Sequence, residues 1–312
     1  MDNVDTFFKL STHIYGQYSI LQFSHIKYNT HFSIIPELGG AINNFSVNGE
    51  QILVGANNLY EIQNQTIKAF AGAQLFPFPN RIKNGKFKIG IKDFQLPVNE
   101  PLLNNSLHGL IYNKAFNVVL VDENKGVIKL RYEYKKENNG YPFHVQIENS
   151  YQLTKNALII KTSLLNKGNA SIPVGHGWHP YFKSTQNIGK SKLQIYSNEY
   201  FELDRQFIPT GKKIKDNTFL KVHQIGTTKF DQCYEIEPSK DLIAKLINPQ
   251  KKLTISLLAK GYPYLQIYIP PNRDCIALEP QTALPDTFNN KIGCIELSPV
   301  EPHHFIFEIR VD

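Results

Sequence analysis

Apolar and polar residues alternate with a period of two along much of this chain. The alternation is clearest in the segments VIKLRYEY (127–134), VQIENSYQL (145–153) and LIIKTSLL (158–165), and LQIYI (265–269) has the same character. A strand with one face in the core and one face in solvent produces this pattern, because successive side chains point to opposite faces. These segments are therefore predicted to be β-strands.

Short turn signals separate the predicted strands. They are Asn48-Gly49, Asn84-Gly85, Asn139-Gly140 and Lys167-Gly168-Asn169, and both Asn and Gly tolerate the backbone of a tight turn. No long stretch repeats with a period of 3.6 residues, and only residues 57–70 are expected to hold a turn or two of helix. Many short strands with frequent turns predict an all-β fold, a large sandwich of two antiparallel sheets.

The composition fits one large globular unit. The chain has 312 residues, 41% of them hydrophobic and 12% aromatic, which is well above a disordered composition. No linker-like segment and no repeat divides it, so a single domain over 1–312 is expected. No apolar run approaches the roughly 20 residues that cross a bilayer, and the N-terminus lacks the basic and apolar segments of a secretory signal. We expect a cytoplasmic protein without a membrane partner.

Charge and cysteine content exclude two further classes. The net charge is +7, but only five of the basic residues are arginine, and the lysines are spread along the chain. Nucleic-acid sites concentrate Lys and Arg on one face, so a lysine-rich solvated surface is predicted instead. Cys233, Cys275 and Cys294 are scattered and have no CxxC spacing, which predicts reduced thiols rather than disulfides or a zinc knuckle.

The stretch VGHGWHPYF (174–182) holds two histidines and the only tryptophan of the chain. The HxxH spacing of His176 and His179 suits two zinc ligands, but a catalytic zinc site needs a third ligand, and no HExxH helix or cysteine pair accompanies them. An imidazole with a pKa near 6.5 also transfers protons at neutral pH. The residues favour proton transfer, with metal binding as the open alternative, and Trp178 is expected to pack in the core.

A carboxylate partner for such a histidine is present in CIALEPQTALPDTFNN (275–290). The apolar strand CIAL leads directly to Glu279 at the start of a Pro- and Asn-rich loop. A half-desolvated carboxylate at the edge of a sheet is well placed to act as a general base. The alternative interpretation is a loop carboxylate that merely ends a strand.

Two other stretches combine polar side chains with stiff or tight surroundings. In FPFPNRIKNGKF (76–87), Asn80 and Arg81 follow an aromatic and proline run, and the planar guanidinium suits vicinal hydroxyls or a carboxylate. In SLHGL (106–110), His108 precedes Gly109, whose missing side chain permits a close backbone approach. A surface arginine before a hairpin and a structural histidine are the alternatives.

Taken in order, these motifs resemble the aldose 1-epimerase (galactose mutarotase) family over most of the chain. The similar segments are IIPELGGAINNFSVNGEQILVG (34–55), LFPFPNRIKNGKF (75–87), LHG (107–109), GYPFHVQIENSYQL (140–153), IPVGHGWHPYF (172–182), PTGK (209–212) with FDQCY (230–234), and ALEP (277–280) with LPDTFNN. The resemblance implies a β-supersandwich fold and interconversion of the α and β anomers of a free hexose, without metal or cofactor.

The resemblance also implies a role for each site residue. His179 would be the general acid and Glu279 the general base, and His108 would share in acid catalysis. Arg81 and Asp231 would hold sugar hydroxyls, and Asn80 is placed with them. His176 is assigned to the substrate site, with strand structure as its alternative. The expected partner is a monosaccharide, and the protein is expected to be a monomer or a homodimer.

Two departures leave the preferred sugar open. The best-known galactose-active members carry His-Ser-Tyr-Phe and Glu-Thr-Gln, where this chain has His-Pro-Tyr-Phe and Glu-Pro-Gln. One alternative is a hexose-6-phosphate 1-epimerase, with Arg81, Lys83 and Lys86 as phosphate ligands, although the scarcity of arginine argues against it. The other is a non-catalytic sugar-binding module on the same fold.

Overall fold

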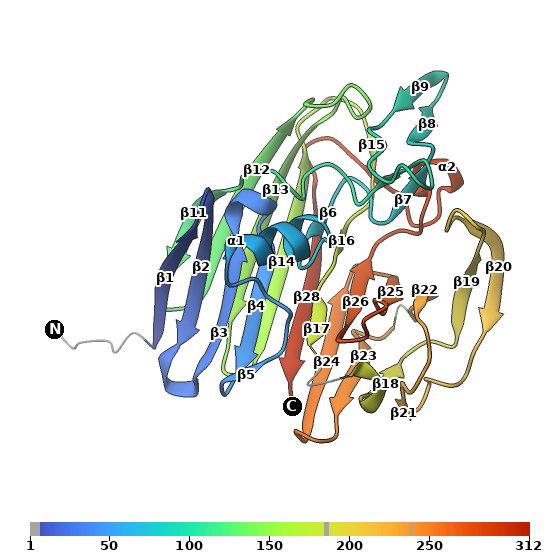
Figure 1. The fold of residues 1–312 in the computed structure, drawn as a ribbon. Helices are drawn as coiled ribbons and strands as arrows, with labels where there is room; N and C mark the ends of the chain where they lie inside the picture. Colours follow the sequence, from blue (N-terminus) through green and yellow to red (C-terminus); the bar gives the residue numbers. More distant parts are fainter. Residues whose placement is uncertain (1–6, 184–186, 238) are drawn as a thin grey trace.

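The protein is built almost entirely from antiparallel strands, as a computed structural model describing residues 7–183, 187–237 and 239–312 shows (Figure 1). Three large sheets dominate, with nine, eight and five strands. The all-β sandwich prediction is confirmed.

The nine-stranded sheet contains the strands with the most regular alternation. In spatial order they are β11 (Asn117–Asp122), β12 (Val127–Lys135), β13 (His144–Leu153), β14 (Ala157–Asn166), β28 (Pro302–Val311), β24 (Leu253–Lys260), β23 (Leu242–Asn248), β18 (Lys192–Ile195) and β21 (His223–Gln224). Along β13, intermediate and buried residues alternate over all ten positions, because one face of the strand packs in the core. The strands predicted from alternation at 127–134, 145–153 and 158–165 are therefore confirmed.

The eight-stranded sheet carries the candidate site. Its strands are β20 (Pro209–Lys215), β19 (Glu199–Leu203), β22 (Asp231–Glu235), β25 (Tyr264–Tyr268), β26 (Cys275–Gln281), β16 (Gly177–Trp178) and β6 (Gln74–Leu75), and β17 (Tyr181–Lys183) also pairs with β26. The predicted strand at 265–269 is β25. All seven residues of β26 are buried, so this strand runs through the centre of the molecule.

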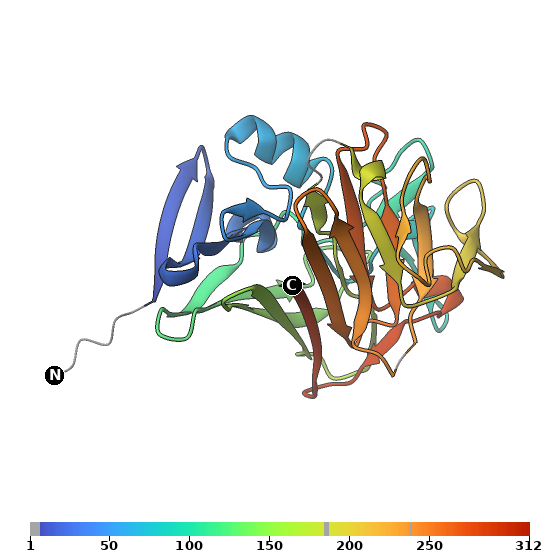
Figure 2. The same cartoon turned by 90° about the horizontal axis from the view of Figure 1, so that it is seen from below.

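The five-stranded sheet lies at one end of the molecule. It consists of β1 (Phe8–Tyr15), β2 (Tyr18–His25), β3 (Thr30–Ile35), β4 (Ala41–Val47) and β5 (Glu50–Gln51). Figures 1 and 2 both place this blue sheet opposite the yellow strands β19 and β20. Three two-stranded sheets complete the strands: β7 (Arg81–Lys83) with β10 (Asn105–Leu107), β8 (Lys86–Ile89) with β9 (Lys92–Gln95), and β15 (Ile172–Val174) with β27 (Ile295–Leu297).

Helical structure is confined to short segments. The longest is α1 (Leu59–Glu61) continued by the π-helical η3 (Ile62–Ile67), which confirms the helical turns predicted within 57–70. The others are α2 (Thr287–Asn290) and the 3₁₀ turns η1 (Ile26–Tyr28), η2 (Pro36–Leu38) and η4 (Ile188–Lys190). Within the described residues, no helix is long and apolar enough to cross a membrane.

The main core lies between the nine-stranded sheet and the other two large sheets, since it also includes residues of β2, β3 and β4. Trp178 of β16 is fully buried and packs edge-on against Tyr151 of β13, at 6.2 Å between ring centroids, which confirms the expected core position of the tryptophan. Gln74 and Asn149 exchange hydrogen bonds across the same interface, at 3.2 and 2.7 Å. Aromatic packing and a buried polar contact thus join the two layers.

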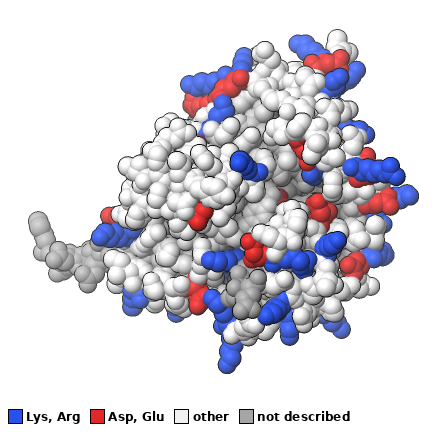
Figure 3. All heavy atoms as spheres, viewed as in Figure 1, with Lys and Arg blue, Asp and Glu red and all other residues white. Residues whose placement is uncertain are grey.

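The surface matches the expected lysine decoration. On the face shown in Figure 3, basic side chains are interspersed with acidic ones rather than gathered into one field. Many of them form exposed ion pairs, such as Lys88 with Asp93 and Lys240 with Glu237. The three cysteines are free thiols.

Candidate active site

A cavity of about 400 Å³ opens over the eight-stranded sheet and collects polar side chains from distant segments. Its lining residues are Lys68, Ala69, Phe70, Asn80, Arg81, Leu107, His108, His179, Tyr181, Asp231, Gln266, Tyr268 and Glu279. Every predicted site residue except His176 is among them.

Strand register brings the carboxylate side of the cavity together. Glu279 of β26 lies directly opposite Gln266 of β25, and Asp231 of β22 lies opposite Tyr268 of β25. Directly opposed residues share one face of a sheet, so these four side chains project into the same space. Gln266 Nε2 donates to Asp231 Oδ1 at 2.9 Å, which links the two sides of this face.

His179 reaches the same space from the end of β16. Its backbone amide donates to Ala73 at 3.0 Å, and its carbonyl accepts from Gly72 at 2.8 Å. Trp178 points into the core, so the next side chain of this extended segment points the other way. His179 Nε2 lies 3.4 Å from Glu279 Oε1, and the two residues are only 4% and 2% exposed. The sequence separates these groups widely, but the fold places them in direct contact.

Left-handed backbone conformations shape the loop side of the cavity. Phe70, Asn80 and His108 have φ values of 57°, 57° and 60°, and all three line the cavity. The His108 amide donates to the Asn80 carbonyl at 2.8 Å, so the two loops brace each other. A Cβ on Gly109 would lie 2.1 Å from the Phe76 carbonyl oxygen, which explains why glycine follows His108. Strained backbone of this kind concentrates at functional sites.

Burial changes the proton affinities of the central pair. It raises the pKa of Glu279 well above its usual range, and the nearby Asp231 carboxylate raises it further. Burial also lowers the pKa of His179 to about 4. Both shifts disfavour charge on the isolated groups, so the pair holds a single proton over a wide pH range.

The flanking groups are shifted for the same reason. Burial, with His179 and Arg81 adding to it, lowers the pKa of His108 well below its usual range. Burial raises the pKa of Asp231, and the Arg81 guanidinium opposes this shift. Strongly perturbed groups gathered in one cavity are a physical mark of a reactive site.

Several buried polar atoms on this cavity lack a hydrogen-bond partner among the described residues. They are His179 Nδ1, His108 Nδ1 and Gln266 Oε1. Buried polar groups are normally satisfied, so three unsatisfied atoms on residues that line one cavity are a further indication of a functional site. Together with Arg81 and Asp231, they suit a molecule rich in hydroxyl groups.

The structure corrects the prediction that His176 contacts the substrate. This residue is fully buried in the core, where its Nε2 contacts Gln74 Nε2 at 2.8 Å and its Nδ1 contacts the Tyr262 hydroxyl at 3.0 Å. Its ring stacks on Phe305 with centroids 5.1 Å apart. His176 is therefore the structural residue behind the site that the alternative interpretation described.

The same geometry bears on the metal alternative. His176 lies in the core, whereas His179 lines the cavity, so the HxxH pair does not converge on one point. Among the residues that the structure describes, no three His, Cys, Asp or Glu side chains gather as a metal-binding group would.

Sequence reasoning missed several residues of the cavity wall. Tyr181 stacks on the His179 ring at 4.8 Å, and it belongs to the same HPYF motif, so its position beside the histidine was a usable signal. Gln266 interrupts the apolar strand YLQIY, another usable signal, because a buried amide in a strand needs partners. Lys68 and Phe70 follow η3 and carried no signal.

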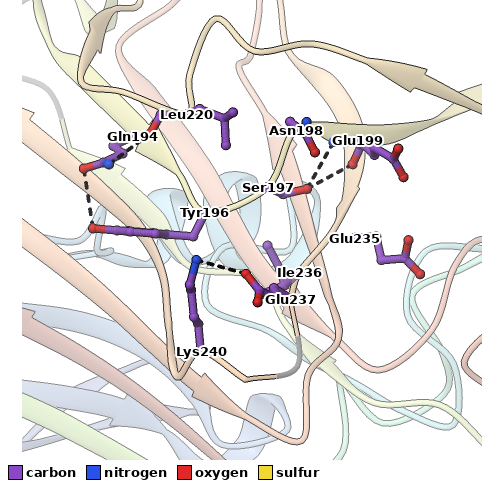
Figure 4. Close-up of a pocket in the computed structure, with 10 residues that line it drawn as sticks. All are labelled: Gln194, Tyr196, Ser197, Asn198, Glu199, Leu220, Glu235, Ile236, Glu237 and Lys240. Atoms are coloured by element: carbon purple, nitrogen blue, oxygen red, sulfur yellow. Dashed lines mark hydrogen bonds and ion pairs between the residues drawn. The ribbon is translucent and has the colours of Figure 1, made fainter.

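A larger groove of about 540 Å³ lies elsewhere on the surface, near β19 (Figure 4). It is lined by acidic and neutral polar side chains with one cation, and Lys240 pairs with Glu237 at 2.9 Å. The described residues that line it include no histidine, so it has no imidazole and carboxylate pair like that of the smaller cavity.

Comparisons with known proteins relate this chain to a family. A model of the aldose 1-epimerase family matches residues 28–310. The Escherichia coli K12 protein named "Uncharacterized protein YihR" is 28% identical over 249 residues, which cover 77% of this chain and 79% of that protein. The galactose mutarotase of Mus musculus is 33% identical over 149 residues, 46% of this chain and 42% of the mouse protein.

Solved structures share the fold over the full length. A galactose mutarotase-like protein from Clostridium acetobutylicum superposes with a TM-score of 0.86 at 22% identity, covering 98% of both chains. The galactose 1-epimerase of Lactobacillus acidophilus superposes with a TM-score of 0.80 at 16% identity, also covering 98% of both chains. At these identities the likeness shows the fold alone.

Proposed function

Because this chain belongs to the aldose 1-epimerase family, we propose that it interconverts the α and β anomers of a free hexose by acid and base catalysis. The observation that carries this proposal is the direct contact of His179 and Glu279, 3.4 Å apart in the wall of a cavity of about 400 Å³. A cavity of this volume accommodates a monosaccharide and leaves room for its hydroxyl ligands.

The reaction requires one acid and one base beside a single carbon. His179 gives a proton to the ring oxygen, Glu279 takes the proton of the C1 hydroxyl, and the bond between C1 and the ring oxygen breaks. The open aldehyde rotates about its C1–C2 bond and closes again to either anomer. Both oxygens are bonded to the same carbon, so neighbouring acid and base groups fit the chemistry better than widely separated ones.

His179 and Glu279 share one proton throughout the proposed reaction. The closed sugar faces imidazolium and carboxylate, and the open sugar faces imidazole and carboxylic acid, so the pair holds one proton in both states. Burial lowers the pKa of His179 and raises that of Glu279, so the empty cavity favours imidazole and carboxylic acid, and contacts from Arg81 and the bound sugar are required to bring the charged state close to it in free energy. A cycle that must pass through both states is faster when neither lies far below the other.

The remaining groups hold the sugar. Arg81, Asp231 and Gln266 offer donors and acceptors for vicinal hydroxyls, and His108 lies close enough to His179 to act with it, at 5.1 Å between ring centroids. The rings of Tyr181 and Tyr268 lie edge to face, with 6.5 Å between their centroids, and suit the apolar face of a pyranose. Asn80 is proposed to act through Arg81, since its Oδ1 accepts from Arg81 Nη1 at 3.1 Å.

A hexose-6-phosphate 1-epimerase is the second candidate. Lys68 lines the cavity and gives this candidate some support. The cations first considered for phosphate are less available, because Arg81 pairs with Glu100 at 2.8 Å and Lys83 lies 4.0 Å from Asp204. The geometry therefore favours a neutral sugar.

Polarimetry tests the proposal directly. Freshly dissolved α-D-glucose and α-D-galactose drift slowly to their equilibrium rotation, and the purified protein is expected to accelerate the drift in proportion to its concentration. A rate equal to the spontaneous one across several aldoses, together with measurable sugar binding, would instead support a non-catalytic sugar-binding module.

A further inference from the structure

Arg81 is the only arginine among the described residues that line the cavity, and a carboxylate lies directly behind it. Glu100 Oε2 accepts from Arg81 Nε at 2.9 Å, and Glu100 Oε1 accepts from Nη2 at 2.8 Å. This bidentate arrangement is the strong form of an arginine–carboxylate pair. The side chains of the pair are 14% and 17% exposed, so solvent screens it only partly.

Further contacts fix both partners. Asn105 Nδ2 donates to Glu100 Oε2 at 3.1 Å, and the backbones of the two residues exchange hydrogen bonds at 3.1 and 3.2 Å. The guanidinium carbon of Arg81 lies 4.6 Å from the centroid of the Phe207 ring, which covers one face. Glu100 thus binds the edge of the guanidinium and Phe207 covers one of its faces, so the position of Arg81 is fixed without a ligand.

The pairing with Glu100 determines which N–H groups of Arg81 remain free to bind a ligand. A guanidinium has five N–H groups, of which Nε and one on Nη2 bond to Glu100, and one on Nη1 bonds to Asn80 Oδ1 at 3.1 Å. One donor remains on each terminal nitrogen. These donors suit hydroxyl groups, while the positive charge is already compensated.

The charged groups around the cavity also favour a neutral ligand. Asp231 and Glu279 line it beside Arg81, and Glu100 adds a third acidic group in direct contact with the guanidinium. An anionic substituent on a sugar would meet these acidic groups and one compensated arginine, with Lys68 as the other cation among the described lining residues. Like charges brought together in a partly buried site disfavour binding.

We propose that Glu100 is a specificity-determining positioning residue, which holds Arg81 as a charge-compensated hydrogen-bond donor and so selects neutral aldoses over phosphorylated ones. This inference rests on the proposed function. Glu100 acts through Arg81 and does not touch the reacting atoms.

The test compares one neutral and one anionic sugar. For the wild type and Glu100→Gln, kcat/KM is measured with glucose and with glucose 6-phosphate, and the affinity for each sugar is measured by calorimetry. We expect Glu100→Gln to shift the selectivity ratio toward the phosphate by about tenfold, mainly through KM, since an uncompensated guanidinium gains a charged partner. The shift should shrink at high salt.

A matched control exists on the nine-stranded sheet. Glu148 accepts from Arg131 Nε at 3.1 Å and from Nη2 at 2.7 Å, and it does not line the cavity. Glu148→Gln removes the same charge from another arginine–glutamate pair, and its selectivity ratio should equal that of the wild type. Should Glu100→Gln fail to fold, Asn105→Ala, which removes one of the two donors to Glu100 Oε2 and so loosens the hold on the carboxylate, should give a smaller shift in the same direction.

The outcomes separate the two proposals. An unchanged ratio in Glu100→Gln, including an equal loss on both sugars, or an equal shift in Glu148→Gln, overturns the role of Glu100. A wild-type protein that accelerates no aldose overturns the proposed function, yet the calorimetric affinities still test Glu100.

Discussion

At the scale of single residues, the proposed reaction depends most on the buried carboxylate of Glu279. It is 2% exposed and contacts His179 and Gln281, whose Nε2 donates to Glu279 Oε2 at 2.9 Å. We expect Glu279→Gln to reduce kcat by about 10²–10⁴, the usual contribution of a positioned base, and to leave sugar affinity within about tenfold. Polarimetry and calorimetry measure the two effects.

Glu148→Gln serves as the control for this variant, because it removes a glutamate from a surface pair outside the cavity. Its rate should match that of the wild type. A Glu279→Gln enzyme that keeps a nearly normal rate would remove the carboxylate from the role of base.

The same carboxylate should cost stability at neutral pH. The pKa of Glu279 is higher in the folded protein than in the unfolded chain, where it is about 4.3. The stability that protonated Glu279 contributes is therefore lost as the pH rises from the unfolded-state pKa through the folded-state pKa. The melting temperature of Glu279→Gln should therefore exceed that of the wild type at pH 8, and the difference should narrow toward pH 4. His179 is present in both proteins, so its own titration is largely common to both curves.

Thermal melts from pH 4 to pH 8 measure this difference. A gap between the two melting temperatures that stays constant over the range would show that burial does not raise the pKa of Glu279.

Residue types in the sequence were enough to nominate His179, Glu279, His108 and Arg81, and the family resemblance added Asp231; all five line one cavity. Gln266 was overlooked although it interrupts an apolar strand, and Glu100 gave no local signal, because its role depends on the packing that places it against Arg81. The same limit produced the error at His176: a polar residue in an apolar stretch has two possible environments, and only packing distinguishes a core network from a cavity.

At the scale of elements, short loops with left-handed backbones aim the side chains of the site. Gly109 has φ +78°, and a Cβ there would lie 2.1 Å from the Phe76 carbonyl oxygen. We expect Gly109→Ala to destabilise the protein by about 1–3 kcal/mol and to reduce kcat, since the loop must move and carry His108 with it. Denaturant unfolding and polarimetry provide the measurements.

Gly90 is a matched control, with φ +57° and nothing within 4 Å of an added Cβ. Gly90→Ala should lower stability by less and leave the rate unchanged. Equal effects from the two substitutions would mean that the tight packing at Gly109 is irrelevant to the site.

Elements differed in how well the sequence predicted them. Alternation located β12, β13 and β14 to within a residue, because each buries one face along its whole length. Which strands pair could not be predicted from the local pattern, because β14 lies beside β28, whose residues come about 150 positions later. The two residues of β16 are too few to show any period, although they direct His179 to Glu279.

At the scale of the whole molecule, a buried polar network joins the two large sheets behind the site. Asn149 of β13 exchanges hydrogen bonds with Gln74 of β6 and accepts from Thr162 Oγ1 at 2.9 Å. Gln74 in turn contacts His176, and burial lowers the pKa of this histidine to about 3, so it stays neutral. A fully connected network of this kind fixes how the two sheets are seated on each other.

Breaking that network should separate stability from catalysis. Asn149→Ala leaves Gln74 Oε1 without its donor in the core, and an unsatisfied buried polar group costs about 1–3 kcal/mol, which denaturant unfolding measures. No member of the network lines the cavity, so KM for an aldose should change less than about threefold. The loss of about 1.4 kcal/mol of binding free energy would change the affinity tenfold. Asn124→Ala, at an exposed turn, is the control and should leave both quantities unchanged. A large rise in KM with little loss of stability would mean that the sheet interface shapes the substrate site rather than supporting it from behind.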